Sequence, residues 1–398
     1  MKEVQLNLFG SKRIEFDECV KLTIESLKTY GQMHDHWAIA WSGGKDSTTL
    51  LTLIVSLIAS GQIEAPKSLQ VFYADTRMEI PPLWIAAKGI IKRLKELNIN
   101  IEIVMAPLDD RFLVYILGRG VPPPSNTFRW CTGQLKVEPM ITALQKLYDQ
   151  TGQKILMLTG VRQGESAIRD GRIAMSCGKD GAECGQGWYQ TGLDSDICST
   201  LAPILHWRVC VVWEWLKYNA PQKAYGQFPT VILADAYGGD EAEEINARTG
   251  CIGCPLVEED TSLKTVIKMD EWSYLKPLLG LKKIYREMRK PQYRLRKDGE
   301  FKKDGSLSKN QQRLGPLDVF ARIDFLNQIL DIQYEVNEAA ERLGRPEIDI
   351  LNEDEYWRIL KLIEDRTFPN GWTGDEVKGD VILDKKYADG SVMETMFK

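Results

Sequence analysis

The chain has 398 residues, more than a single domain usually takes, so we expect two structural units. A hydrophobic fraction of 43% and a charged fraction of 27% exclude a largely disordered chain. The net charge of −5 argues against a protein that coats nucleic acid with its whole surface.

The expected cellular compartment decides how the cysteines are interpreted. There is no run of about 18 apolar residues, and the first residues do not show the basic and apolar halves of a signal peptide. We therefore expect a cytoplasmic protein without membrane contact. Disulfides are rare in that reducing compartment, so the eight cysteines make a metal or cluster site the leading question.

The first two thirds of the chain alternate between strand and helix patterns. An amphipathic helix at 16–34 precedes a short apolar strand in HWAIAWSGG and an apolar helix at 47–59. Later segments continue this alternation, with strands at 68–75, 100–106 and 154–161 and helices at 83–97 and 137–150. This pattern is typical of the α/β class, in which a parallel twisted sheet carries helices on both faces.

The composition changes near residue 280. Basic segments, turn signals and helical patterns follow, which predicts a boundary there, with units 1–280 and 281–398 and a mainly helical C-terminal region. The stretch Leu281–Arg313 holds twelve Lys/Arg and four Asp/Glu, a local net of +8 in an acidic chain. We expect a polyanion to dock there, although a solvated basic connector is the more common meaning of such a run.

Three predicted strands end at polar segments. Ligands of parallel α/β sheets bind at the carboxyl ends of the strands, where Ser42–Ser47, Asp75 and Gly160–Arg162 all fall. In the first segment, Ser42-Gly43-Gly44-Lys45-Asp46-Ser47, glycines let the backbone approach a polyphosphate and the next helix offers its first amides. Lys45 supplies a positive charge, and Asp46 supplies a magnesium ligand or a cap. We therefore predict a phosphate-binding loop for ATP and Mg²⁺.

The loop and several later motifs carry a family resemblance. SGGKDS resembles the pyrophosphate loop of PP-loop ATP pyrophosphatases, which cleave ATP between the α- and β-phosphates. Further segments resemble the phosphoadenylyl-sulfate reductase superfamily over about residues 30–260: ADTRME at 74–79, RWCT with KVEP at 129–139, GVRQGES with Arg169, and API..W with VWE at 202–214. The implied fold is that of the adenine nucleotide alpha hydrolases.

Within that superfamily, the chain looks most like the DNA phosphorothioation sulfurtransferases of the Dnd and Ssp systems, the DndC type. FRWCT, the CS.LAPI..W segment and the late CIGC occur together here, and no cysteine follows Cys254 as a reductase's catalytic tail would require. The resemblance implies adenylation of a DNA backbone phosphate, with sulfur then replacing a non-bridging oxygen. DNA, a cysteine desulfurase and other phosphorothioation proteins are the implied partners.

The cysteines divide into a motif pair and its candidate companions. Cys251-Ile252-Gly253-Cys254 places two thiols one turn apart, which suits an iron–sulfur cluster, a redox pair or half of a zinc site. By the resemblance, Cys131 and Cys198 complete a four-thiolate [4Fe-4S] set. Cys177 and Cys184, in a glycine-rich loop, are rival ligands.

The remaining candidate side chains are charged. Arg162 and Arg169 suit phosphate oxygens, with a surface ion pair as the alternative for Arg169. Glu165 and Asp75 are expected to contact ribose or magnesium, or else to cap local structure.

Three alternatives to the sulfurtransferase stay open at this stage: a reductase-like enzyme, a transfer RNA thiolase, and a nucleotide-sensing scaffold without catalysis. Arg129 and Lys136 border the proposed cluster and suit an anionic acceptor.

Overall fold

A computed structural model describes residues 15–164, 190–194, 196–239, 249–300, 306, 308, 310–369, 371–387 and 391–394. The chain divides into two compact units, each made from separate segments. Unit 1 comprises Met1–Ala74, Pro82–Val104 and Met140–Arg248, and unit 2 comprises Asp75–Pro81, Met105–Pro139 and Thr249–Lys398. This division does not follow the single boundary near residue 280, because a composition change along the chain does not reveal segments that leave one unit and return to it.

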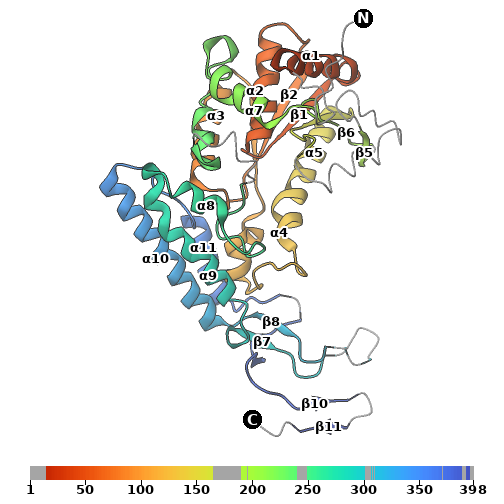
Figure 1. The fold of residues 1–398 in the computed structure, drawn as a ribbon. Helices are drawn as coiled ribbons and strands as arrows, with labels where there is room; N and C mark the ends of the chain where they lie inside the picture. The colour runs from red at the N-terminus through yellow and green to blue at the C-terminus, as the bar shows by residue number, and fades with distance from the viewer. Residues whose placement is uncertain are drawn as a thin grey trace, which may run out of the picture. The chain divides into compact units, whose positions relative to one another are not determined.

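Unit 1 is built on a six-stranded sheet with the order β3-β2-β1-β4-β6-β5 (Figure 1). Its strands are β1 (His36–Trp41), β2 (Ser68–Ala74), β3 (Asn100–Val104), β4 (Ile155–Thr159), β5 (Gln190–Asp194) and β6 (Cys198–Leu201). Five of them run parallel, and β5 pairs antiparallel with β6. The predicted parallel α/β sheet is therefore confirmed.

Helices cover both faces of this sheet. On one face, Ala38, Phe72 and Met157 form a core with Ala143 and Leu144 of α5 (Glu138–Thr151). On the other face, the indole N–H of Trp41 donates to Thr48 Oγ1 of α2 (Lys45–Ala59) at 2.8 Å. Helix α2 is apolar almost all round, and its residues from Thr48 to Leu57 are buried. This burial fixes the start of α2 beside the ends of the central strands.

The other helices among the described residues of unit 1 are mostly short. They are α1 (Phe16–Ser26), the π-helix η1 (Leu27–Gly31), α3 (Pro81–Glu96), α7 (Val209–Glu214), the π-helix η6 (Trp215–Asn219), and the 3₁₀ helices η7 (Lys223–Tyr225) and η8 (Val231–Tyr237). Trp207, Trp213 and Trp215 are fully buried, so the tryptophans of this segment belong to the core, as their helical spacing indicates.

Unit 2 is mainly helical, as the sequence predicts for the C-terminal region. Its longer helices are α9 (Leu279–Glu287), α10 (Val319–Leu343) and α11 (Glu353–Glu364). Asp318 caps the start of α10, and Gly344 ends it in the left-handed conformation. Asn352 and Glu355 form a capping box at the start of α11.

Shorter elements complete unit 2. Helical segments are η2 (Leu108–Asp110), η3 (Val114–Gly118), α4 (Trp130–Thr132), η4 (Gly133–Val137), α8 (Thr261–Val266), η10 (Asp270–Leu278) and η11 (Pro291–Tyr293). Strands are β7 (Arg294–Arg296), β8 (Leu314–Leu317), β9 (Val377–Lys378), β10 (Lys385–Lys386) and β11 (Val392–Met393). Among the described helices of both units, none is long and apolar enough to span a bilayer.

Candidate functional site

The predicted phosphate loop joins β1 to α2. Gly43 turns the chain with a φ of +76°, a conformation that favours glycine. The loop is then closed by its two serines, since the Ser42 N–H donates to Ser47 Oγ at 3.2 Å and the two hydroxyl oxygens lie 3.1 Å apart. Gly44 is the N-cap of α2 and has no side chain to cap the first turn. The amides of this turn are the groups that bind anions at helix N-termini.

Lys45, Asp46 and Arg162, the charged side chains predicted to serve the nucleotide, meet beside this loop. Asp46 Oδ1 accepts from Arg162 Nε at 2.5 Å, and Asp46 Oδ2 lies 3.3 Å from Lys45 Nζ. A second Arg162 nitrogen donates to the carbonyl of Trp207 at 2.9 Å. Lys45 and Arg162 are buried, with 4% and 2% exposure. Two cations therefore share one carboxylate, which leaves a net positive charge at the helix terminus where a polyphosphate is expected.

Asp46 was predicted to hold Mg²⁺ or to act as a cap. Its contacts show whether its carboxylate is available for a metal ion. Both carboxylate oxygens are already engaged, one by Arg162 and the other by Lys45. A carboxylate suits Mg²⁺, but here the ion would replace at least one of these two cations. Mg²⁺ binding by Asp46 therefore requires a rearrangement of these ion pairs.

Gly160 has a steric role at this site. It directly follows β4, and a Cβ atom added there would lie 2.7 Å from the backbone nitrogen of Ser47. Any larger residue would push against the first turn of α2. Gly160, predicted as a nucleotide contact, therefore lets the end of β4 approach the phosphate loop closely.

Tyr237, at the end of η8, is a loop contact that the sequence analysis missed. Its hydroxyl accepts the backbone N–H of Lys45 at 3.1 Å, and the Lys45 ammonium lies 4.9 Å from the centre of its ring. Tyr237 is 4% exposed. It lies 192 residues after Lys45 in the chain and belongs to no recognised motif, so only the three-dimensional structure reveals this contact.

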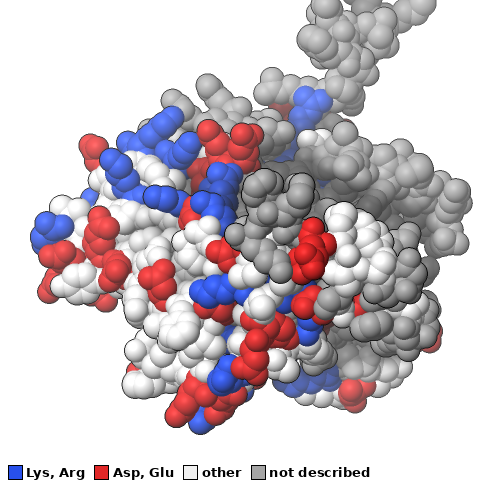
Figure 2. Space-filling view, turned by 90° about the horizontal axis from the view of Figure 1, so that it is seen from below, with Lys and Arg blue, Asp and Glu red and all other residues white. Residues whose placement is uncertain are grey.

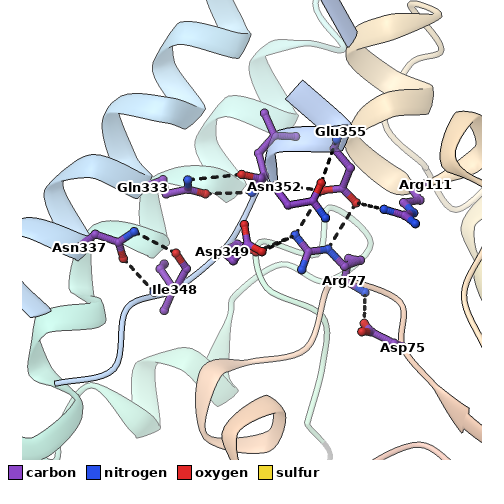
Figure 3. Close-up of polar contacts among 10 residues, drawn as sticks. Asp75, Arg77, Arg111, Gln333, Asn337, Ile348, Asp349, Asn352 and Glu355 are labelled. Carbon is purple, nitrogen blue, oxygen red and sulfur yellow. Dashed lines mark hydrogen bonds and ion pairs between the residues drawn. The ribbon is translucent and has the colours of Figure 1, made fainter. Parts of the chain in front are cut away.

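Asp75, predicted to contact ribose or magnesium, takes part in a local turn of unit 2. Its Oδ1 accepts the backbone N–H of Arg77 at 2.8 Å, and Arg77 has a φ of +61°. The Arg77 guanidinium then meets both carboxylate oxygens of Glu355 at 3.3 Å (Figure 3). Asp349 Oδ2 lies 3.2 Å from Arg77, and Arg111 reaches Glu355 at 3.3 Å. This buried network holds the turn in which Asp75 stands.

The Cys251–Cys254 segment forms a tight turn in unit 2. Gly253 has a φ of +64°, and the Cys254 N–H donates to the Cys251 carbonyl at 3.2 Å. The carboxylate of Asp260 accepts the Gly253 N–H at 3.0 Å. Ile252 N–H donates to the Met78 carbonyl at 2.8 Å. These hydrogen bonds therefore fix the backbone of the turn that carries the two thiols.

Cys131 belongs to the same neighbourhood. Burial raises the pKa of Cys251 to about 11; the nearby Lys136 opposes this, whereas Glu79, Cys254 and Cys131 add to it. Burial, followed by Cys254, raises the pKa of Cys131, and Arg129 acts in the opposite direction. The structure thus brings three of the four predicted thiols together, with Lys136 and Arg129 near them.

Cys198 has a different environment. It lies in β6 with 4% exposure and packs among Ala143, Ile155 and Met157 in the core of unit 1. That position suits a small apolar residue, whereas the resemblance implied a cluster ligand. Cys177, Cys184, Glu165 and Arg169 lie outside the described residues. Within the described ranges, no three His, Cys, Asp or Glu side chains form a ready-made metal site.

Much of the basic segment Leu281–Arg313 supports local structure. Lys282 Nζ donates to the Cys254 carbonyl at 3.1 Å, and Arg286 donates to the carbonyls of Val257 and Glu258. Burial lowers the pKa of Lys282. On the face in Figure 2, Lys and Arg side chains are interspersed with Asp and Glu. Lys282 and Arg286 therefore tie the cysteine turn to α9, and a docking surface in this segment depends on its other cations.

Comparison with known proteins shows what most of unit 1 is similar to. Residues 36–223, which include the phosphate loop and all six strands, match the family model of the phosphoadenosine phosphosulfate reductase domain. This part of the chain is therefore similar to the nucleotide-binding, PP-loop-like domain of phosphoadenosine phosphosulfate reductases.

Two uncharacterized proteins of Methanocaldococcus jannaschii resemble the chain. Each is 26% identical, over 239 and 233 residues, and the alignments cover 59% and 58% of this chain. The chain spans 46% and 38% of the length of these two relatives.

Solved structures show more distant likenesses. A phosphoadenylyl-sulfate reductase from Candida auris has a TM-score of 0.33 and 14% identity, covering 55% of this chain and 90% of the reductase. The FMN adenylyltransferase of Candida glabrata, solved with FMN and an ATP analogue, has a TM-score of 0.33 and 18% identity, covering 51% of this chain and 57% of that enzyme.

Proposed function

We propose that the chain is an ATP-dependent sulfurtransferase of DNA phosphorothioation, which uses ATP pyrophosphatase chemistry to adenylate a DNA backbone phosphate. The observation that carries this proposal is the complete phosphate loop, at which Lys45, Asp46 and Arg162 meet the first turn of α2. The three neighbouring thiols of unit 2 support the sulfur-transfer half of the proposal. The DNA acceptor is supported by the resemblance of the motifs.

The loop residues have distinct tasks in the first half-reaction. The first-turn amides of α2 hold the β- and γ-phosphates, which leave together as pyrophosphate. Lys45 and Arg162 neutralise charge on the departing group, and Asp46 keeps both cations aimed at the loop. An oxygen of the acceptor phosphate forms the new bond to the α-phosphorus as the bond to pyrophosphate breaks. Catalysis is then mostly positioning and electrostatics.

The second half-reaction replaces the adenylated oxygen. Sulfur at the oxidation level of sulfide forms a bond to the acceptor phosphorus, and the bond to the oxygen of AMP breaks. Cys131, Cys251 and Cys254 are the residues that would hold a [4Fe-4S] cluster, which when bound supplies a site to carry that sulfur. Arg129 and Lys136, near these thiols, would hold the anionic acceptor. A cysteine desulfurase is the proposed sulfur donor, within a complex of other phosphorothioation proteins. It delivers persulfide sulfur, so a two-electron thiol or electron-carrier reductant must also take part to release that sulfur at the sulfide level.

The test is pyrophosphate release from ATP by anaerobically purified protein, with DNA, with transfer RNA and without nucleic acid. We expect release that DNA stimulates and that Lys45→Ala abolishes, because Lys45 contributes directly to the positive charge of the loop. Lys95→Ala, on the exposed side of α3, is the matched control. Stimulation by transfer RNA alone would assign a transfer RNA thiolase. Sulfite release from an adenylyl sulfate would assign a reductase, and no turnover by folded protein would leave a nucleotide-sensing scaffold.

A further inference from the structure

A side chain of the protein itself accepts a hydrogen bond from the first turn of α2. The Tyr237 hydroxyl accepts the N–H of Lys45, the first residue of the helix, at 3.1 Å. A Cβ atom added to Gly44 would lie 3.4 Å from the same oxygen. The phenol oxygen therefore lies against the Gly44–Lys45 backbone, where a phosphate oxygen would accept a hydrogen bond.

The tyrosine ring also contacts the charge of the loop. Its centre lies 4.9 Å from Lys45 Nζ, within the range of a cation–π contact. The ring of Trp213 packs edge-on against Tyr237, with 5.2 Å between centroids. Tyr237 therefore contacts both the backbone amide and the ammonium group of Lys45. The proposed function assigns these two groups to binding of the nucleotide phosphates.

We propose that Tyr237 is a built-in cap of the phosphate loop, and that nucleotide binding displaces its hydroxyl from the Lys45 amide. A phosphate oxygen is the better acceptor for this N–H because it carries charge and benefits from the helix dipole, whereas a phenol is neutral. In the absence of nucleotide the phenol satisfies a buried donor that would otherwise be costly. The cap therefore stabilises the empty loop and lowers its affinity for phosphates.

The backbone after Tyr237 suits such a movement. Gly238 has a φ of +109° and Gly239 a φ of +66°, so two successive residues adopt conformations that favour glycine. Side chains with a Cβ would restrict this turn. The glycine pair gives the end of η8 the torsional freedom that displacement of the tyrosine requires.

The experiment compares binding of inorganic pyrophosphate to wild-type protein and to Tyr237→Phe by titration calorimetry. The substitution removes the competing hydroxyl and keeps the ring over Lys45. We expect about 2- to 10-fold tighter binding, the range expected for removal of one competing hydrogen bond. Tyr218→Phe, at an exposed tyrosine of the same unit, is the matched control and should bind as wild type does.

This inference rests on the proposed function. The outcomes of the binding experiment distinguish failure of the tyrosine cap from failure of the nucleotide site. Equal or weaker binding by folded Tyr237→Phe, with wild-type binding intact, overturns the cap and leaves the nucleotide site standing. No pyrophosphate or ATP binding by either protein overturns both. As a second measurement, fluorotyrosine-labelled wild-type protein should show the ¹⁹F resonance of Tyr237 shifting on pyrophosphate addition, and an unmoved resonance at saturation refutes displacement.

Discussion

Glu355 is the centre of the ion-pair network of unit 2, so Glu355→Gln is an informative perturbation. The carboxylate is only 3% exposed and faces Arg77 and Arg111, which are 12% and 21% exposed. Glutamine keeps the size of the side chain and retains an oxygen for the capping box with Asn352. The substitution therefore removes the negative charge and replaces the oxygen that accepts from Arg77 Nε and Arg111 with an NH2 group, which cannot accept a hydrogen bond.

The magnitude follows from burial and distance. Removing one partner of a buried ion pair usually costs about 3–5 kcal/mol, because the other charge is left without compensation. Two features reduce that cost here. The nitrogen–oxygen distances to Glu355 are 3.3 Å, longer than the best charge-assisted hydrogen bonds, and Asp349 remains 3.2 Å from Arg77. We expect a decrease of about 2–3 kcal/mol in the free energy of unfolding.

The assay is urea denaturation of the full chain, followed by far-ultraviolet circular dichroism. Asp354→Asn, at an exposed position in the same first turn of α11, is the matched control, with an expected change of about 0.5 kcal/mol or less. If Glu355→Gln and Asp354→Asn give the same unfolding curve, the ion pairs of Glu355 do not stabilise the fold as argued.

Two further predictions concern the thiols and the cations. Cys251→Ser should remove the absorption near about 400 nm expected of anaerobically purified protein, because it deletes a proposed cluster ligand, whereas Cys198→Ala should keep the colour. Zinc without iron in elemental analysis, or a colourless folded Cys198→Ala protein, would contradict this ligand set. Lys283→Glu with Arg289→Glu should weaken DNA binding and flatten the dependence of log affinity on log salt by about 0.9 for each DNA phosphate that is no longer neutralised. An unchanged slope would move the DNA site to the surface around Arg129.

The sequence by itself determined the parts of the protein that depend on neighbouring residues. The strands around residues 36–41, 68–74, 100–104 and 155–159 are short apolar runs separated by helical patterns, and this alternation is typical of a parallel sheet with helices on its faces. The phosphate loop is equally local, since a strand, two glycines and a helix start suffice to form it. For the same reason the tight turn of Cys251–Cys254 was recognisable from its spacing.

Only the tertiary structure decided which distant residues meet. The two units interleave along the chain, so a boundary inferred from composition had no means of finding them. Cys198 fits a motif, yet its strand places it in the apolar core. Lys282 belongs to the basic segment, yet it donates a hydrogen bond to the carbonyl of Cys254. Tyr237 reaches the Lys45 amide across 192 residues of chain. Such contacts depend on how strands and helices pack in three dimensions, and no short window of sequence contains that information.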